Sequence, residues 1–91
     1  MYFVYLVRCA DNSLYCGQTR DLNERIKEHN GEKNKGAKYT RSRRPVVLVY
    51  KEIADTLSNA LKREAEVKRM PKHKKELLVT FKYPLNNPHF D

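Results

Sequence analysis

The sequence predicts a small α+β domain in which helices flank one three-stranded sheet. Three segments are rich in β-branched, aromatic or aliphatic residues, and the first two are separated by a short turn. Three further segments carry helix start and stop signals. The order of these elements, ββαβαα, indicates a small antiparallel or mixed sheet covered by helices. A chain of 91 residues has room for one modest core, so we expect a single domain over residues 1–82.

The N-terminal part reads as a β-hairpin followed by a helix. Residues 2–9 and 14–19 favour extended structure, and residues 10–13, Ala-Asp-Asn-Ser, have the composition of a turn. Asp21 is a suitable N-cap for a helix that reaches about Asn30, after which a glycine ends it.

The C-terminal part predicts a strand and two helices. Residues 31–45 are polar and basic and read as a loop, whereas the apolar run 46–50 predicts a third strand buried on both faces. Asp55 or Thr56 caps a helix to about Met70, and Pro71 interrupts it before a short helix over 72–80. The proline-containing residues 83–91 are expected to form a loose tail.

The strong positive charge points to a polyanionic partner. Nineteen Lys and Arg against eleven Asp and Glu give a net charge of +8 and a pI near 9.7. Nucleic acid is the commonest partner of such a domain, although basic residues also serve simply as solvated faces. No apolar run is long enough to span a membrane, and Cys9 and Cys16 are too few for a disulfide scaffold or a zinc site. We therefore expect a cytoplasmic protein without membrane contact.

Glu64 interrupts the apolar face of the helix over 55–70. At 100° per residue, this face also carries the apolar side chains Leu57, Ala60, Leu61, Ala65 and Val67. An unpartnered buried carboxylate costs several kcal/mol, so Glu64 needs a partner. A metal ion or a catalytic proton would explain it, and so would an ion pair with Lys68 or Arg25.

Two further groups of polar side chains are candidates for chemistry. Arg25 and His29 lie one turn apart on the first helix, and Arg25 could clamp a phosphate or be an ordinary surface arginine. His29 could equally be a helix-end histidine. Tyr5 and Tyr15 lie on the hairpin, and they share a face if its loop has an odd number of residues.

The spacing of these residues resembles the GIY-YIG endonuclease family. Two tripeptides each contain a tyrosine, Phe3-Val4-Tyr5 and Tyr15-Cys16-Gly17, and the two tyrosines are ten residues apart. Arg25 follows the second tyrosine by ten residues, and the later segment Ala60-Leu61-Lys62-Arg63-Glu64 is similar to the family's metal-binding helix. The resemblance covers roughly residues 2–70. With Ala37-Lys38-Tyr39-Thr40 and Arg43-Arg44-Pro45, the chain looks like the small stand-alone bacterial members.

The resemblance implies a three-stranded antiparallel sheet with the active site on one face, and an odd hairpin loop that brings Tyr5 and Tyr15 together. It implies a catalytic set of Tyr5, Tyr15, Arg25 and Glu64, with Gly17 and His29 in ancillary roles. Glu64 would bind a single Mg²⁺ or Mn²⁺ ion, because no second carboxylate has a suitable place. Which tyrosine acts as the base stays open.

The implied activity is divalent-metal-dependent hydrolysis of DNA phosphodiester bonds, in DNA repair or recombination. Contacts to the DNA backbone are expected from Lys38, Tyr39, Arg41, Arg43, Arg44 and Lys68. A protein partner could supply specificity.

Departures from the family motif leave two other functions open. Val4 and Cys16 replace isoleucines, and Phe3 replaces the first glycine. A catalytically weak or inactive nucleic-acid-binding module on the same fold would explain the charge equally well. A protein-interaction adaptor would bind its partner without steep salt dependence.

Overall fold

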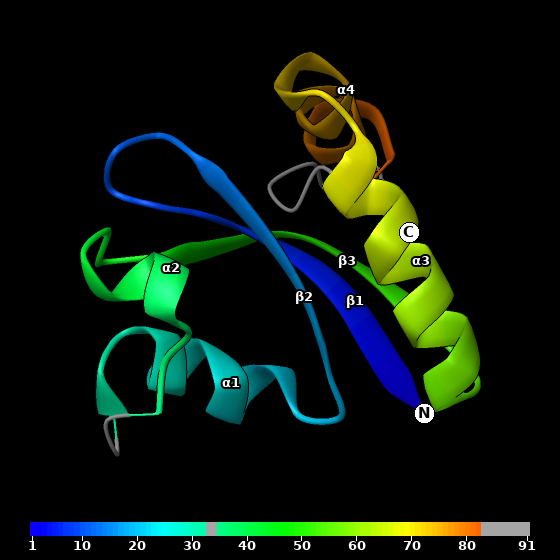
Figure 1. Ribbon diagram of the computed structural model, residues 1–91, viewed down its shortest axis with the longest axis horizontal. Helices are drawn as coiled ribbons and strands as arrows, with labels where there is room; N and C mark the ends of the chain where they lie inside the picture. The colour runs from blue at the N-terminus through cyan, green and yellow to red at the C-terminus, as the bar shows by residue number, and fades with distance from the viewer. Residues whose placement is uncertain (33–34, 83–91) are drawn as a thin grey trace.

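A computed structural model of the chain describes residues 1–32 and 35–82. The predicted tail, residues 83–91, lies outside this range. Figure 1 shows three strands in a single sheet with helices on either side. The strands are β1 (Tyr2–Arg8), β2 (Leu14–Thr19) and β3 (Val47–Ala54), in the antiparallel order β2-β1-β3. This confirms the predicted α+β fold with a three-stranded antiparallel sheet.

The hairpin loop settles which face the two tyrosines occupy. β1 ends at Arg8 and β2 begins at Leu14, so the loop has an odd number of residues, 9–13. Tyr5 pairs with Gly17, and Val7 pairs with Tyr15. Because directly paired residues share a face and alternate residues along a strand do too, Tyr5 and Tyr15 lie on the same face.

Helix α1 (Leu22–His29) covers that face of the sheet. Its N-cap is Asp21, whose side chain accepts from the Glu24 amide, and Gly31 follows it with a φ of +109° that favours glycine. Leu22 and Ile26 pack against a buried cluster formed by Tyr5, Val7, Cys9 and Val46.

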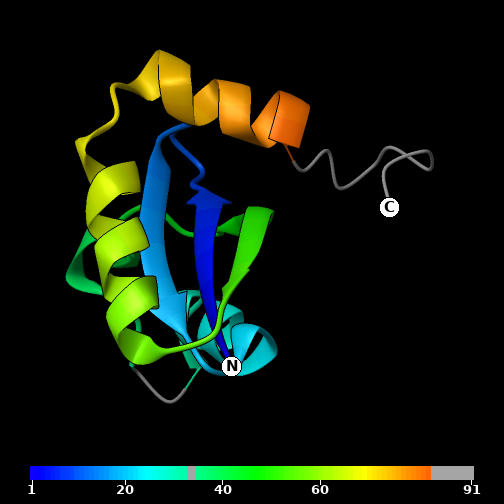
Figure 2. The ribbon, with the colours of Figure 1, turned by 90° about the vertical axis from the view of Figure 1, so that its right-hand side faces the viewer.

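Helix α3 (Leu57–Arg69) covers the opposite face (Figures 1 and 2). Its N-cap is Thr56, which accepts from the Asn59 amide. The main apolar core lies beneath α3 and consists of Val4, Leu6, Leu14, Cys16, Tyr50, Ala60, Val67 and Leu78. Arg63 also ties α3 to β3, since its Nε donates to Glu52 at 2.8 Å, and the Tyr50 hydroxyl donates to the same carboxylate.

The chain ends its described part in helix α4 (Lys72–Leu77) and a π-helical turn, Leu78–Lys82. Arg8 fixes α4 to β1 through two hydrogen bonds to the Glu76 carboxylate, of 2.6 and 2.8 Å. These bonds lower the pKa of Glu76 to about 2. The described part of the chain contains no helix that is long and apolar enough to cross a membrane.

Three details differ from the sequence-based expectations. The segment read as a loop contains a short helix, α2 (Lys38–Arg41). β3 is not buried on both faces, because it is an edge strand on which Val47 is 61% exposed. The apolar face of α3 is also narrower than its periodicity indicates, since Leu57 and Leu61 are exposed while Ala60 and Val67 are fully buried.

Candidate active site

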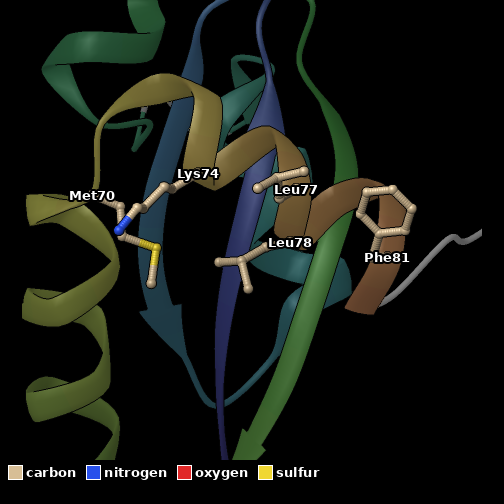
Figure 3. Close-up of a pocket in the computed structure, with 5 residues that line it drawn as sticks. All are labelled: Met70, Lys74, Leu77, Leu78 and Phe81. Atoms are coloured by element: carbon tan, nitrogen blue, oxygen red, sulfur yellow. The ribbon is translucent and has the colours of Figure 1, made fainter.

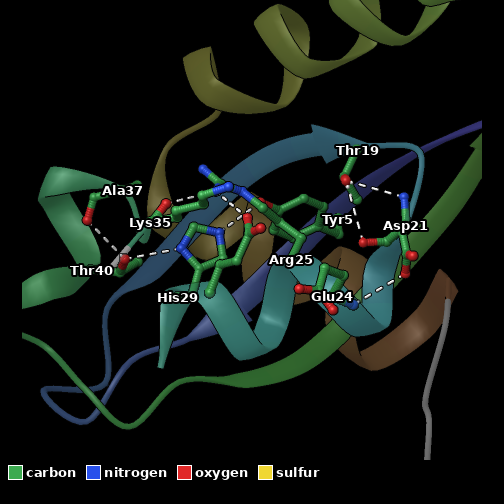
Figure 4. Close-up of polar contacts among 10 residues, drawn as sticks. Tyr5, Thr19, Asp21, Glu24, Arg25, His29, Lys35, Ala37 and Thr40 are labelled. Carbon is green, nitrogen blue, oxygen red and sulfur yellow. Dashed lines mark hydrogen bonds and ion pairs between the residues drawn. The ribbon is translucent and has the colours of Figure 1, made fainter. Parts of the chain in front are cut away.

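The candidate site centres on a buried hydrogen bond between Tyr5 and His29. Tyr5 extends from the central strand and His29 from the last turn of α1, and both are almost completely inaccessible to solvent. The Tyr5 phenol oxygen lies 2.7 Å from His29 Nε2 (Figure 4). The other ring nitrogen, Nδ1, lies 3.0 Å from the Thr40 hydroxyl on α2. The two ring nitrogens therefore connect the sheet to α2.

The surroundings of this pair hold both groups in their neutral forms. Burial, assisted by the positive charge of Arg25, lowers the pKa of His29 to about 4. Burial also raises the pKa of Tyr5 above its ordinary value, while the neighbouring Arg25 guanidinium acts in the opposite direction. At neutral pH a phenol thus faces an uncharged imidazole.

Gly17 provides the space that the Tyr5 phenol occupies. The two residues are directly paired in the hairpin. A Cβ atom on Gly17 would lie 2.4 Å from the Tyr5 hydroxyl oxygen, closer than any stable contact. The last glycine of the second tripeptide therefore determines where the first tyrosine sits.

Arg25 lies beside Tyr5 and is held by two contacts. Its Nη1 donates to Glu28 at 2.9 Å and to the Lys35 carbonyl at 3.0 Å (Figure 4). The Arg25 side chain retains 27% exposure, so part of the guanidinium can meet a ligand next to the phenol. This arrangement suits a phosphate-binding arginine.

Tyr15 contacts both His29 and the exposed ring of Tyr39. Its ring meets His29 edge-on at 5.3 Å and stacks on Tyr39 at 5.6 Å between centroids. Arg43 lies over the Tyr39 ring at 3.9 Å from its centroid. Tyr39 thus contacts both Tyr15 and Arg43 and keeps 39% exposure.

Glu64 lies on α3, on the opposite face of the sheet from α1, and Lys68 links it to the hairpin. The Glu64 side chain is 18% exposed and pairs with Lys68 at 3.5 Å. The Lys68 ammonium also lies 5.9 Å from the Tyr15 ring centroid, which connects Glu64 with the hairpin. Of the ion pairs considered from the sequence, the structure forms the one with Lys68, whereas Arg25 pairs with Glu28.

The donor set fits a largely hydrated divalent cation. Within residues 1–32 and 35–82, no three His, Cys, Asp or Glu side chains are close enough to enclose a metal ion. Mg²⁺ commonly keeps several waters and takes one or two carboxylates together with substrate phosphate oxygens. Glu64, whose side chain is 18% exposed, could supply such a carboxylate.

The basic residues predicted to bind DNA fall into two groups. Lys38 and Arg41 are exposed on α2, and Arg43, although tied to Asp11, lies beside Tyr39. Arg44 instead points inward, where its Nε donates to the His29 carbonyl at 2.7 Å and its Nη2 atom is shielded from solvent. Arg44 therefore stabilises the C-terminal end of α1, which carries His29, and does not point toward solvent.

Sequence reasoning assigned no role to Thr40. This residue is fully buried although it lies in a polar and basic segment. Its only signal in the sequence is its place in the Ala37-Lys38-Tyr39-Thr40 motif. This motif does not indicate whether the Thr40 side chain points into the protein or toward solvent. The contact with His29 depends on how α2 folds back onto α1, which local patterns do not encode.

A hollow on the other side of the sheet has a different character. Met70, Lys74, Leu77, Leu78 and Phe81 line it (Figure 3), and its lining is almost entirely apolar. It lies where α3 ends and α4 begins, next to the core beneath α3. It has no converging polar groups of the kind that surround Tyr5.

Comparison with known proteins shows the family of the chain. The family model of the GIY-YIG catalytic domain matches residues 1–76, and the chain belongs to the GIY-YIG family, whose members are typically nucleases.

Within that family the chain is similar to UPF0213 proteins. One from Staphylococcus aureus is 51% identical over 78 residues, which cover 86% of this chain and 93% of the relative. The solution NMR structure of a UPF0213 protein from Bacillus halodurans is 43% identical, with a TM-score of 0.57, and the match covers 90% of this chain and 86% of that one. The solution NMR structure of a protein from E. faecalis is 33% identical, with a TM-score of 0.61, over 99% of this chain and 94% of the other.

Proposed function

We propose that this protein is a divalent-metal-dependent endonuclease that hydrolyses DNA phosphodiester bonds in DNA repair or recombination. The observation that carries the proposal is the buried hydrogen bond of 2.7 Å between Tyr5 and a neutral His29. Folding alone does not require a polar pair of this kind on a face otherwise formed by apolar side chains. The pair can relay a proton, because the phenol faces Nε2 of a neutral imidazole, and a His29 with a pKa near 4 would hold the transferred proton only transiently.

In this mechanism Tyr5 is the general base and His29 its proton acceptor. The positive charge of Arg25 lies beside the Tyr5 oxygen, and we place the phenol hydrogen in the 2.7 Å contact with His29 Nε2. As Tyr5 takes a proton from the attacking water, its own proton passes to His29. Tyr5 need not become a free phenolate, which its buried surroundings disfavour.

The remaining residues bind and orient the substrate. Arg25 holds the scissile phosphate beside the phenol. A divalent cation held by Glu64 would supply compensation for the charge that develops on the phosphate. Tyr15, supported by Tyr39, positions the water or the phosphate between these groups.

The basic residues give the protein affinity for the DNA backbone rather than for a sequence. Lys38 and Arg41 are exposed on α2, and the Lys68 ammonium lies 5.9 Å from the centroid of the Tyr15 ring. Contacts of this type position the backbone and carry no sequence information. We propose that specificity comes from the shape of the DNA or from a protein partner.

Cleavage of labelled branched, nicked and single-stranded DNA with Mg²⁺ or Mn²⁺ tests this function. Glu64→Gln should reduce the cleavage rate by about a hundredfold or more, because it removes the carboxylate that binds the cation. Glu66→Gln is the matched control, since Glu66 lies two residues further along the same helix and its side chain is 57% exposed.

Three outcomes separate the alternatives. Metal-dependent cleavage that Glu64→Gln abolishes and Glu66→Gln preserves supports the nuclease. Binding of DNA without cleavage by the wild type would favour the nucleic-acid-binding module. Binding that does not weaken with salt, to a protein rather than to DNA, would favour the adaptor.

A further inference from the structure

Thr40 is a fully buried hydroxyl that the reaction described above does not use. It lies on α2, between the exposed residues Tyr39 and Arg41. Its oxygen is 3.0 Å from the Ala37 carbonyl and 3.0 Å from His29 Nδ1 (Figure 4). A buried polar group with two such contacts constrains the hydrogen positions of its partners.

The hydrogen positions follow from counting donors. A hydroxyl has one hydrogen, and a carbonyl can only accept, so the Thr40 hydroxyl donates to Ala37. Its oxygen must then accept from His29, which places the single hydrogen of the neutral imidazole on Nδ1. The lone pair of Nε2 is left facing the Tyr5 phenol at 2.7 Å.

The opposite arrangement satisfies fewer groups. If Thr40 donated to Nδ1, the hydrogen of the imidazole would lie on Nε2 and point at the Tyr5 oxygen. The Tyr5 oxygen would then accept from His29, and its own buried hydrogen would lack the imidazole as an acceptor. Leaving a buried donor unpaired is unfavourable, so this arrangement is disfavoured.

We propose that Thr40 is a positioning residue that holds His29 in the Nδ1–H tautomer, with Nε2 ready to receive the Tyr5 proton. This inference rests on the proposed function for its catalytic consequence, but the tautomer itself can be measured without activity. It also makes α2 part of the active site, because the helix that exposes Lys38 and Arg41 also orients the imidazole.

Nitrogen-15 NMR of the histidine ring tests the proposal directly. In the wild type at neutral pH, the spectrum of His29 should show a protonated Nδ1 and an unprotonated Nε2. Thr40→Ser keeps the hydroxyl and should preserve this pattern. Thr40→Val keeps the shape without the hydroxyl and should shift the hydrogen partly or wholly to Nε2.

The same variants give a kinetic signature. Thr40→Val should lower the single-turnover cleavage rate by about tenfold or more without changing the Kd for DNA, because it misdirects the base and leaves the surface intact. Thr40→Ser should restore the rate to within a few-fold of the wild type.

Each failure has its own meaning. A wild-type His29 with its hydrogen on Nε2 would overturn the proposal, whether or not the variants fold. An unchanged tautomer in folded Thr40→Val would also overturn it. If the protein cuts no DNA at all but shows the expected tautomers, the proposed function fails while the role of Thr40 in orienting His29 stands.

Discussion

On the α1 side of the sheet, His29 and Thr40 are fully buried next to Tyr5, whereas the core on the α3 side is built almost entirely from apolar side chains. Both sides bury a tyrosine of the sheet. Tyr50 on the α3 side donates to Glu52, a carboxylate paired with Arg63 that stays partly exposed. Tyr5 instead meets a neutral histidine that is shielded from solvent.

We interpret the two kinds of burial differently: the apolar burial under α3 stabilises the fold, and the polar burial under α1 serves the proposed reaction. Apolar packing beneath α3 provides the stability that a small domain needs. The polar network beneath α1 costs desolvation and restricts hydrogen positions, and it lies beside the side chains that the family motif predicts to be catalytic. The expected effects of substitution should therefore divide by face.

The largest effect on stability should come from the α3 face. Leu6 is fully buried in the central strand, so Leu6→Ala should lower the free energy of unfolding by about 2–5 kcal/mol. Urea denaturation measures this change. Activity per folded molecule should be retained, and a Leu6→Ala protein that is stable but inactive would contradict the division between faces.

On the α1 face, buried His29 should make the free energy of unfolding depend on pH. The pKa of His29 is about 4 in the folded protein, below its ordinary value of 6.5, so the folded state binds this proton less readily than the unfolded state. The stability due to neutral His29 is complete above pH 6.5 and is lost as the pH falls to 4. Over this interval the free energy of unfolding should fall by about 3 kcal/mol.

The control for this titration is His29→Gln, which keeps a polar side chain but cannot titrate. Arg25, Glu28 and Arg44 provide the charges around the ring and remain in the variant. Urea unfolding at several pH values should show a flatter profile between pH 6.5 and 4 for His29→Gln. Glu76 contributes in a different window, between 4.5 and about 2, because its pKa is depressed.

Removal of charge from α2 should weaken DNA binding moderately. Lys38→Gln with Arg41→Gln should reduce the slope of log Kd against log salt by about 0.9 per lost phosphate contact. Fluorescence anisotropy over a salt series measures the slope. Lys62→Gln is a suitable comparison, as it removes an exposed charge from α3, and an equal effect there would show that only net charge matters.

The smallest effect should be that of Lys68 on the affinity for a divalent cation. Lys68 neutralises Glu64 at 3.5 Å, and its own side chain is half exposed. Lys68→Met should therefore raise the affinity of the free protein for Mn²⁺ by about two- to fivefold, since a pair of this exposure contributes at most about 1 kcal/mol. Isothermal titration calorimetry measures it, and an unchanged affinity would place the cation away from Glu64.

The sequence predicts the fold well because its local signals agree with one another. The Asp21 and Thr56 caps, the turn of the hairpin and the tyrosine-containing strands all lie where their patterns indicate. The α2 helix was missed, and the prediction that β3 is buried on both faces was wrong. A four-residue helix has no periodicity, and an apolar run alone does not tell an edge strand from a central one.

The sequence predicts which residues form the candidate site but not how they contact one another. Motif spacing predicts Tyr5, Tyr15, Arg25, His29 and Glu64, and their roles stay a prediction. The contact of His29 with Thr40 and the inward direction of Arg44 arise from the packing of α2 onto α1, which is a tertiary arrangement. Glu64 was predicted to lie on the apolar face of its helix with an ion-pair partner among the alternatives, and the structure gives it an 18% exposed side chain with Lys68 as its partner.

The most direct test of the central claim compares Tyr5→Phe with Tyr50→Phe, each of which removes one buried hydroxyl from one face. We expect Tyr5→Phe to lower the single-turnover cleavage rate by about a hundredfold or more at unchanged DNA affinity, because it removes the general base. Tyr50→Phe should cleave at nearly the wild-type rate. Equal rates for Tyr5→Phe and the wild type would contradict the account, because the Tyr5–His29 pair would then have no part in the chemistry.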